Sequence, residues 1–127
     1  LRWLTENVAD TRVPGPPGPR RYASSFARTW EALEEVARER RGWRVRRADE
    51  EAGRLEAVCR TPVLRFRDDL MVWVSLDRDG LTRVDARSSS RVGVGDLGTN
   101  ARRIRGLWRS LDDRLEPVRG GGGDSPG

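Results

Sequence analysis

Residues 70–88 read LMVWVSLDRDGLTRVDARS, and this stretch predicts a β-hairpin at the centre of the fold. Residues 70–76 are the most apolar of the candidate strands, which favours a strand in the middle of a sheet. Asp79-Gly80 is a dipeptide typical of a hairpin turn. Residues 82–88 then alternate between apolar and polar positions, so we expect them to form the neighbouring antiparallel strand.

An amphipathic helix is predicted upstream of the strands, over residues 23–41. Ser24 or Ser25 can cap its N-terminus, and Gly42 can end it. Charged residues fill the other positions, as in a helix that packs one face on a core. The apolar residues that recur at helical spacing are Phe26, Trp30, Leu33 and Ala37.

A second amphipathic helix is predicted near the end of the chain, over residues 99–115. Thr99 or Asn100 can cap its start. Trp108 flanks the apolar stripe of this helix. The stripe itself consists of Ile104, Leu107, Leu111 and Leu115.

Two shorter strands are predicted between the first helix and the hairpin, over residues 43–47 and 55–60. The element order is therefore helix, four strands, helix. Short links favour antiparallel pairing, and the apolar face of the resulting sheet needs a cover. We expect an α+β fold of two layers, in which two helices pack on one face of a four-stranded antiparallel sheet.

The two ends of the chain are expected to lie outside this domain, which we place at residues 23–116. Residues 13–19 read VPGPPGP, and proline fixes the backbone and lacks an N–H donor, so residues 1–22 predict an extended arm. Residues 117–127 end in GGGGDSPG, which predicts a disordered tail.

The composition excludes several kinds of catalytic site. The 127 residues include no histidine and a single cysteine, Cys59, which argues against the usual zinc sites, a Ser/His triad and a Cys/His dyad. Cys59 alternates with core positions, so we interpret it as a buried thiol rather than a nucleophile. We expect no cofactor, and no run of residues is long and apolar enough to span a membrane.

The charge is carried by arginine alone. All 25 basic residues are arginine, and the formal net charge is +5. We interpret the lack of lysine as a codon bias toward G and C. Most of the excess lies in residues 87–119, where a basic face could meet phosphate, acidic lipid or an acidic protein, or could simply be a solvated helix face.

Two polar segments are more specific than core packing or solubility requires. The first is FRDD at residues 66–69, and the second is RSSSRVGVGDLGTN at residues 87–100. Asp68 and Asp69 are adjacent and lead into the central strand, and neighbouring residues in strand conformation point to opposite faces of a sheet. We expect one of them to pair with Arg87 or Arg91. Their opposite directions make them a poor general acid/base pair.

The second segment runs from a strand through a glycine-rich loop into the last helix. Free N–H groups at a helix N-terminus can bind an anion, and Arg91 and Arg103 could add side-chain donors. A purely structural turn is the alternative, in which Asp96 caps or pairs with arginine and Asn100 caps the helix. The candidate ligand-binding residues are Arg87, Ser90, Arg91, Gly93, Asp96, Gly98, Asn100 and Arg103.

These two segments resemble the DUF1499 family, a domain of unknown function. The family pattern is F-x-D-D followed by R-S-x-S-R-x-G-x-x-D-x-G-x-N-x-x-R-I. The resemblance brings no established activity. It implies that many relatives sit at or near membranes, often behind an N-terminal segment, so an upstream segment that is missing here is one expectation. The matching residues are Phe66, Asp68, Asp69, Arg87, Ser88, Ser90, Arg91, Gly93, Asp96, Gly98, Asn100, Arg103 and Ile104.

The sequence favours a non-catalytic binding or accessory module, cytoplasmic or membrane-associated, whose partner is an anionic ligand, an acidic protein or a membrane surface. One alternative is an enzyme for an anionic small molecule, with Asp69 or Asp96 as base and Arg91 as electrostatic stabiliser. Another is weak nucleic-acid binding by the last helix, which the modest net charge makes less favoured. The arginines of that helix are Arg102, Arg103, Arg105 and Arg109.

Overall fold

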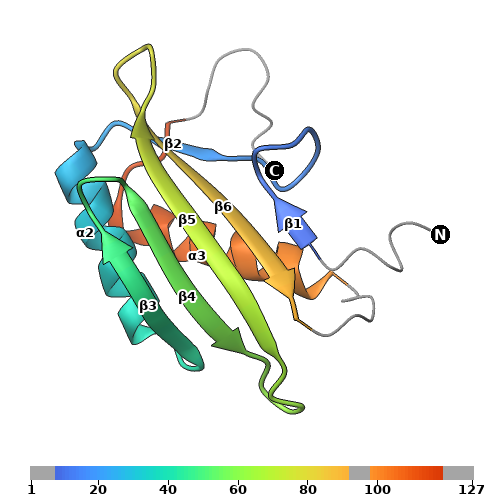
Figure 1. The fold of residues 1–127 in the computed structure, drawn as a ribbon. Helices are drawn as coiled ribbons and strands as arrows, with labels where there is room; N and C mark the ends of the chain where they lie inside the picture. The colour runs from blue at the N-terminus through green and yellow to red at the C-terminus, as the bar shows by residue number, and fades with distance from the viewer. Residues whose placement is uncertain (1–7, 92–97, 119–127) are drawn as a thin grey trace.

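The computed structural model describes residues 8–91 and 98–118 of the chain. Two α-helices pack on one face of an antiparallel sheet, which confirms the predicted α+β class (Figure 1). The elements are β1 (Val8–Asp10), β2 (Arg20–Tyr22), α2 (Phe26–Glu39), β3 (Trp43–Asp49), β4 (Arg54–Arg60), β5 (Arg67–Leu76), β6 (Thr82–Ser90) and α3 (Thr99–Arg114).

The sheet has six strands, so the expectation of four was wrong. Its order is β1-β6-β5-β4-β3, and β2 also pairs with β6. Both extra strands lie before α2, so the element order begins with two strands rather than with a helix. Each is three residues long, too short to show an alternating pattern in the sequence.

The expected hairpin forms the centre of the sheet. Strand β5 is the middle strand of the main path, and β6 pairs with it from Asp68↔Ser90 to Leu76↔Thr82. The turn between them closes with Gly80 N–H donating to the carbonyl of Asp77. Strand β5 begins three residues earlier than predicted, which places both motif aspartates on a strand.

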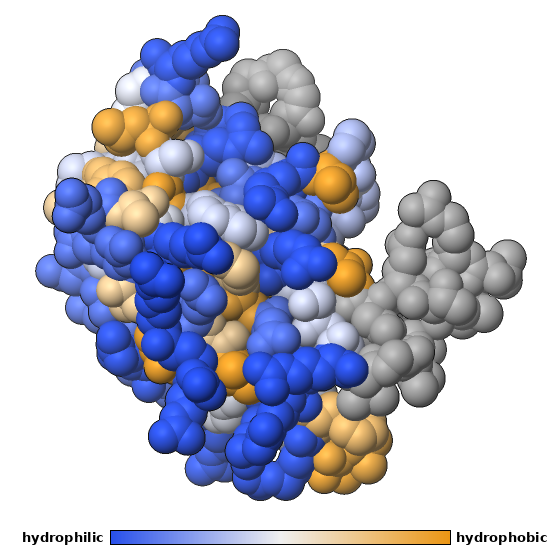
Figure 2. Space-filling view, in the orientation of Figure 1, coloured by the Kyte–Doolittle hydropathy of each residue, from blue (hydrophilic) through white to orange (hydrophobic). Residues whose placement is uncertain are grey.

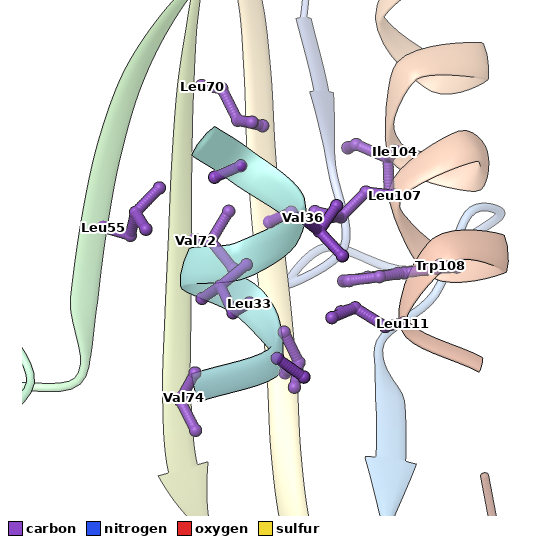
Figure 3. Packing of buried hydrophobic residues seen from close by; sticks show 14 of the residues in the cluster. Leu33, Val36, Leu55, Leu70, Val72, Val74, Ile104, Leu107, Trp108 and Leu111 are labelled. Carbon is purple, nitrogen blue, oxygen red and sulfur yellow. The ribbon is translucent and has the colours of Figure 1, made fainter. Parts of the chain in front are cut away.

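The core lies between the sheet and the helices. Leu70, Val72 and Val74 of β5 face the helices, and each is at most 4% exposed. Figure 3 shows how the side chains of both helices meet them. The helix residues labelled there are Leu33 and Val36 of α2, and Ile104, Leu107, Trp108 and Leu111 of α3.

The helix caps agree with the sequence at one of the two N-termini. Ser25 caps α2 and accepts a hydrogen bond from the backbone N–H of Arg28, as expected. The cap of α3 is Gly98, with φ +82°, and not Thr99 or Asn100. Asn100 instead lies within α3, and its side chain points toward the sheet, where it contacts Ser88.

Candidate functional site

The motif residues that face the helices form a buried polar cluster, which we define as Asp68, Ser88, Ser90, Asn100 and Arg103. Nη1 of Arg103 lies 2.7 Å from Oδ2 of Asp68, and the two side chains are 9% and 2% exposed. The same Nη1 donates to Oγ of Ser88 at 3.0 Å and to Oδ1 of Asn100 at 2.9 Å. One guanidinium thereby joins β5, β6 and α3.

Asn100 connects α3 to the two serines of the buried polar cluster. Its side-chain Oδ1 accepts from Ser88 Oγ at 2.7 Å, and its Nδ2 donates to Ser90 Oγ at 2.9 Å. Ser88 and Ser90 alternate on β6, so both hydroxyls point toward α3. Ser88, Ser90, Asn100 and Arg103 are hydrogen-bonded to one another, and Asn100 is fully buried, so these bonds hold α3 against the sheet.

Asp68 is the least satisfied member of the buried polar cluster. Among the described residues, its Oδ2 accepts no hydrogen bond with suitable direction, although Arg103 lies at ion-pair distance. Arg103 is the ion-pair partner of this carboxylate. A buried carboxylate of this kind depends on the neighbouring guanidinium for its stability.

Asp69 lies on the opposite, open face of the sheet, as its position next to Asp68 predicted. Arg91 donates to its two carboxylate oxygens, with Nη2 at 2.7 Å from Oδ1 and Nε at 3.0 Å from Oδ2. These side-chain hydrogen bonds lower the pKa of Asp69. The predicted pairing of one aspartate with Arg91 is confirmed, and both partners are 46% exposed.

Arg87 also lies on the open face, next to a group that the sequence did not indicate. Its Nε is 3.8 Å from Oδ2 of Asp10, which forms a shorter ion pair with Arg12 at 2.8 Å. The Arg12 guanidinium in turn lies over the ring of Trp73, 4.0 Å from its centroid. Asp10 is the last residue of β1, and Arg12 follows it two residues later, so the pairing of β1 places both beside this face. The sequence pattern did not predict this strand.

The sheet therefore separates the candidate ligand-binding residues into two groups. Ser90 on β6 lies on the helix side of the sheet and contacts Asn100 of α3, and Arg103 of α3 points toward the same side. Arg87 and Arg91 lie on the open face. Gly98 caps α3, and Phe66 ends the β4–β5 loop. Gly93 and Asp96 lie outside the described residues.

One end of the open face carries a row of arginines. Arg60 and Arg67 are cross-strand partners, and Arg91 donates its backbone N–H to the carbonyl of Arg67. Arg44 on β3 is the cross-strand partner of Val58, which lies two residues before Arg60 on β4. We call these four exposed residues, Arg44, Arg60, Arg67 and Arg91, the basic end of the open face.

The basic end has little compensating negative charge. Among the described residues, only Arg91 of the four forms an ion pair, with Asp69. Figure 2 shows the open face, where hydrophilic side chains predominate. Four neighbouring guanidinium groups with a single paired carboxylate leave an excess of positive charge, and such a surface attracts anions.

The described residues contain no group of three or more Cys, Asp and Glu side chains that could hold a metal ion. A groove of about 480 Å³ lies along α2, lined by Glu31, Glu34, Glu35 and other residues outside the motif. Cys59 is buried as predicted, and desolvation raises the pKa of its thiol to about 12.

A second group of arginines lies on the exposed face of α3. Arg102, Arg105 and Arg109 are exposed, whereas Arg103 turns inward to the buried polar cluster. Within the described part of the chain, neither helix has the length and apolar character that crossing a bilayer requires.

Comparison of the sequence with known proteins and families gives the same family as the motif. Neither the curated proteins nor the solved structures gave a match. Residues 10–111 match the family described as protein of unknown function (DUF1499). That range covers most of the chain, both motif segments included, and the chain therefore belongs to the DUF1499 family.

Proposed function

We propose that this chain is a non-catalytic binding module that contacts an anionic partner through the basic end of the open face. The observation that carries the proposal is the row formed by Arg60 on β4, Arg67 on β5 and Arg91 directly after β6. Like charges directly opposite each other in a sheet are destabilising. An anion that bridges these side chains relieves this repulsion and gains charge-assisted hydrogen bonds.

Arg91 connects this surface to the sequence motif. It is one of the candidate ligand-binding residues, and it directly precedes the glycine-rich loop. Its pairing with Asp69 leaves the guanidinium half exposed, so an anion can still approach it. The loop itself lies outside the described residues, and the proposal therefore rests on the arginines alone.

The positions of the carboxylates support the non-catalytic interpretation. Asp69 is held by Arg91 on the open face, while Asp68 is buried against Arg103 on the other side of the sheet. The two carboxyl groups do not converge on one space, which a general acid/base pair would need. The buried polar cluster is accordingly assigned to stability and not to chemistry.

Binding of inositol hexakisphosphate, a soluble polyanion, tests the proposal. Isothermal titration calorimetry at low salt should detect binding to the wild type, and added salt should weaken it. The double variant Arg60→Glu, Arg67→Glu should weaken binding by about tenfold or more, because two attractive charges become repulsive. The absence of wild-type binding would contradict the proposal.

The stripe on α3 provides a control with the same change in net charge. At about 0.1 M salt, where the Debye length is about 10 Å, the variant Arg105→Glu, Arg109→Glu should keep an affinity within about threefold of the wild type, because charges on α3 are then screened from the open face. A larger loss in this control than in the first variant would move the anion site to α3. That result would favour the nucleic-acid alternative.

A further inference from the structure

The β4–β5 loop, residues 61–66, exposes three apolar side chains. Val63 is 88% exposed, Leu64 is 69% exposed and Phe66 is 43% exposed. Figure 2 shows hydrophobic surface at the end of the molecule where Figure 1 places this loop. A contiguous apolar group of this kind on a surface marks an interaction site.

The loop is held in a defined shape by its own hydrogen bonds. The backbone N–H of Thr61 donates to the carbonyl of Phe66 at 2.9 Å, and the N–H of Phe66 donates to Oγ1 of Thr61 at 2.9 Å. The N–H of Arg65 donates to the carbonyl of Thr61 at 3.1 Å. These bonds close the base of the loop, so that Val63 and Leu64 form its tip.

Positive charge surrounds this apolar tip. Arg60, Arg65 and Arg67 flank it in the chain, and residues 57–67 contain no Asp or Glu. Arg91 adjoins Arg67 on the next strand, so the basic end of the open face and the loop form one continuous surface. An apolar tip with a basic surround is complementary to lipid tails beneath a layer of phosphate groups.

We propose that this loop docks the domain on an anionic lipid bilayer, with Val63 and Leu64 inserted among the acyl chains. The inference rests on the proposed function for the role of the basic end, and it identifies the anionic partner as lipid phosphate. A protruding tip of two aliphatic residues suits a deformable bilayer. The flat apolar area that a protein partner normally buries is not offered by so small a tip.

Sedimentation with lipid vesicles tests this inference. The wild type should bind vesicles made of equal parts phosphatidylcholine and phosphatidylglycerol, and should not bind phosphatidylcholine alone. The variant Val63→Ser, Leu64→Ser should lower the partition coefficient by about tenfold or more, because the apolar contribution to membrane binding is lost. Both changed residues are exposed, so the melting temperature should stay the same.

Leu76 provides the matched control for the loop. It is 67% exposed at the other end of β5, next to Asp77 and away from the basic end. Leu76→Ser removes a comparable exposed leucine and should leave vesicle binding unchanged. Equal losses in both variants would show that general surface hydrophobicity, and not the loop, causes binding, and would overturn the inference.

Insertion can be observed directly at the tip. Leu64→Cys adds an exposed thiol that a polarity-sensitive dye can label, while Cys59 is buried and stays unlabelled. On mixed vesicles the dye emission should shift to the blue, and lipids brominated in their acyl chains should quench it. An unchanged emission spectrum on bound protein would contradict insertion of the tip.

The failures of the two proposals are distinguishable. Wild-type binding to inositol hexakisphosphate without binding to mixed vesicles leaves the proposed function intact and overturns docking on lipid. Failure with both probes overturns both. A dimer in size-exclusion chromatography that Val63→Ser, Leu64→Ser dissociates would assign the tip to a second copy of the chain, which also overturns docking on lipid.

Discussion

The carboxylate of Asp68 and the guanidinium of Arg103 lie 2.7 Å apart between the sheet and α3, and both side chains are almost completely buried. Arg103 comes from the second turn of α3, and Asp68 from the start of β5. The pair fixes the N-terminal part of α3 against the start of β5. Its members are both motif residues, so part of the motif serves the fold.

Arg103→Met should destabilise the protein by about 3–5 kcal/mol, because Asp68 is left as a buried charge without a partner. Urea unfolding followed by circular dichroism measures the change. The double variant Asp68→Leu, Arg103→Met should recover part of the loss, since it removes both charges. A cost below about 1 kcal/mol for the single variant would show that water reaches Asp68.

Asn100→Ala and Arg91→Ala should have different effects on stability. Asn100 is fully buried and bonded to Ser88, Ser90 and Arg103, so its loss should cost about 1–3 kcal/mol. Arg91 is exposed, and removal of its pair with Asp69 should change the melting temperature little. A large loss of stability for Arg91→Ala would give the exposed pair a structural role and would weaken its assignment to binding.

The free energy of unfolding should fall in acid, because Asp10 becomes protonated and loses its ion pair with Arg12. Arg12 donates hydrogen bonds to its side chain and lowers the pKa of Asp10 below the ordinary 3.8. The folded protein therefore binds this proton more weakly than the unfolded chain does. The stabilisation is present above pH 3.8 and is lost as the pH falls through the lowered pKa.

Asp10→Asn tests this pH dependence, because the variant should lose stability at neutral pH and show a shallower decline in acid. Arg12→Gln removes the partner of Asp10 and should act in the same direction. The free energy of unfolding is measured by urea titration over a series of pH values. An Asp10→Asn variant whose curve runs parallel to the wild type at every pH would refute the assignment.

Gly53→Ala should destabilise the fold much more than Gly80→Ala. Gly53 has φ +69°, and an added Cβ would overlap the carbonyl oxygen of Val74, so we expect a cost on the order of 3 kcal/mol or more. Gly80 has φ +84° in open space, so only the left-handed strain of about 1–2 kcal/mol applies. Thermal unfolding compares the two, and similar melting temperatures would contradict the predicted overlap.

The long elements could be predicted because each repeats its pattern several times. Strand β5 and both helices show apolar residues at regular spacing, and the structure places these in the core. Strands β1 and β2 could not be predicted, because three residues give no period and β6, their partner, is distant in the sequence. The stacking of Arg12 on Trp73 depends on β1 and was missed for the same reason.

The members of the buried polar cluster could be named from the motif, but their arrangement could not be predicted. Arg44, Arg60 and Arg67 of the basic end were not among the candidate residues, because only the strand pairing brings them together. Alternation on a strand was sufficient to separate Asp68 from Asp69. Asn100 and Arg103 share helical spacing with Leu107, so the sequence held a signal that both face the core. Which residues of the sheet they contact depends on how α3 is rotated about its axis, and the spacing alone does not determine this rotation.

The pairing of β1 and β2 with β6 has a consequence for synthesis on the ribosome. Within this domain, β1 and β2 are translated before the other elements and pair with β6, which is the last strand of the sheet to be made. Until β6 has been synthesised, β1 and β2 have no strand with which to form backbone hydrogen bonds. Closure of the sheet is therefore a late event in translation, and the nascent chain has an incomplete edge for most of that time.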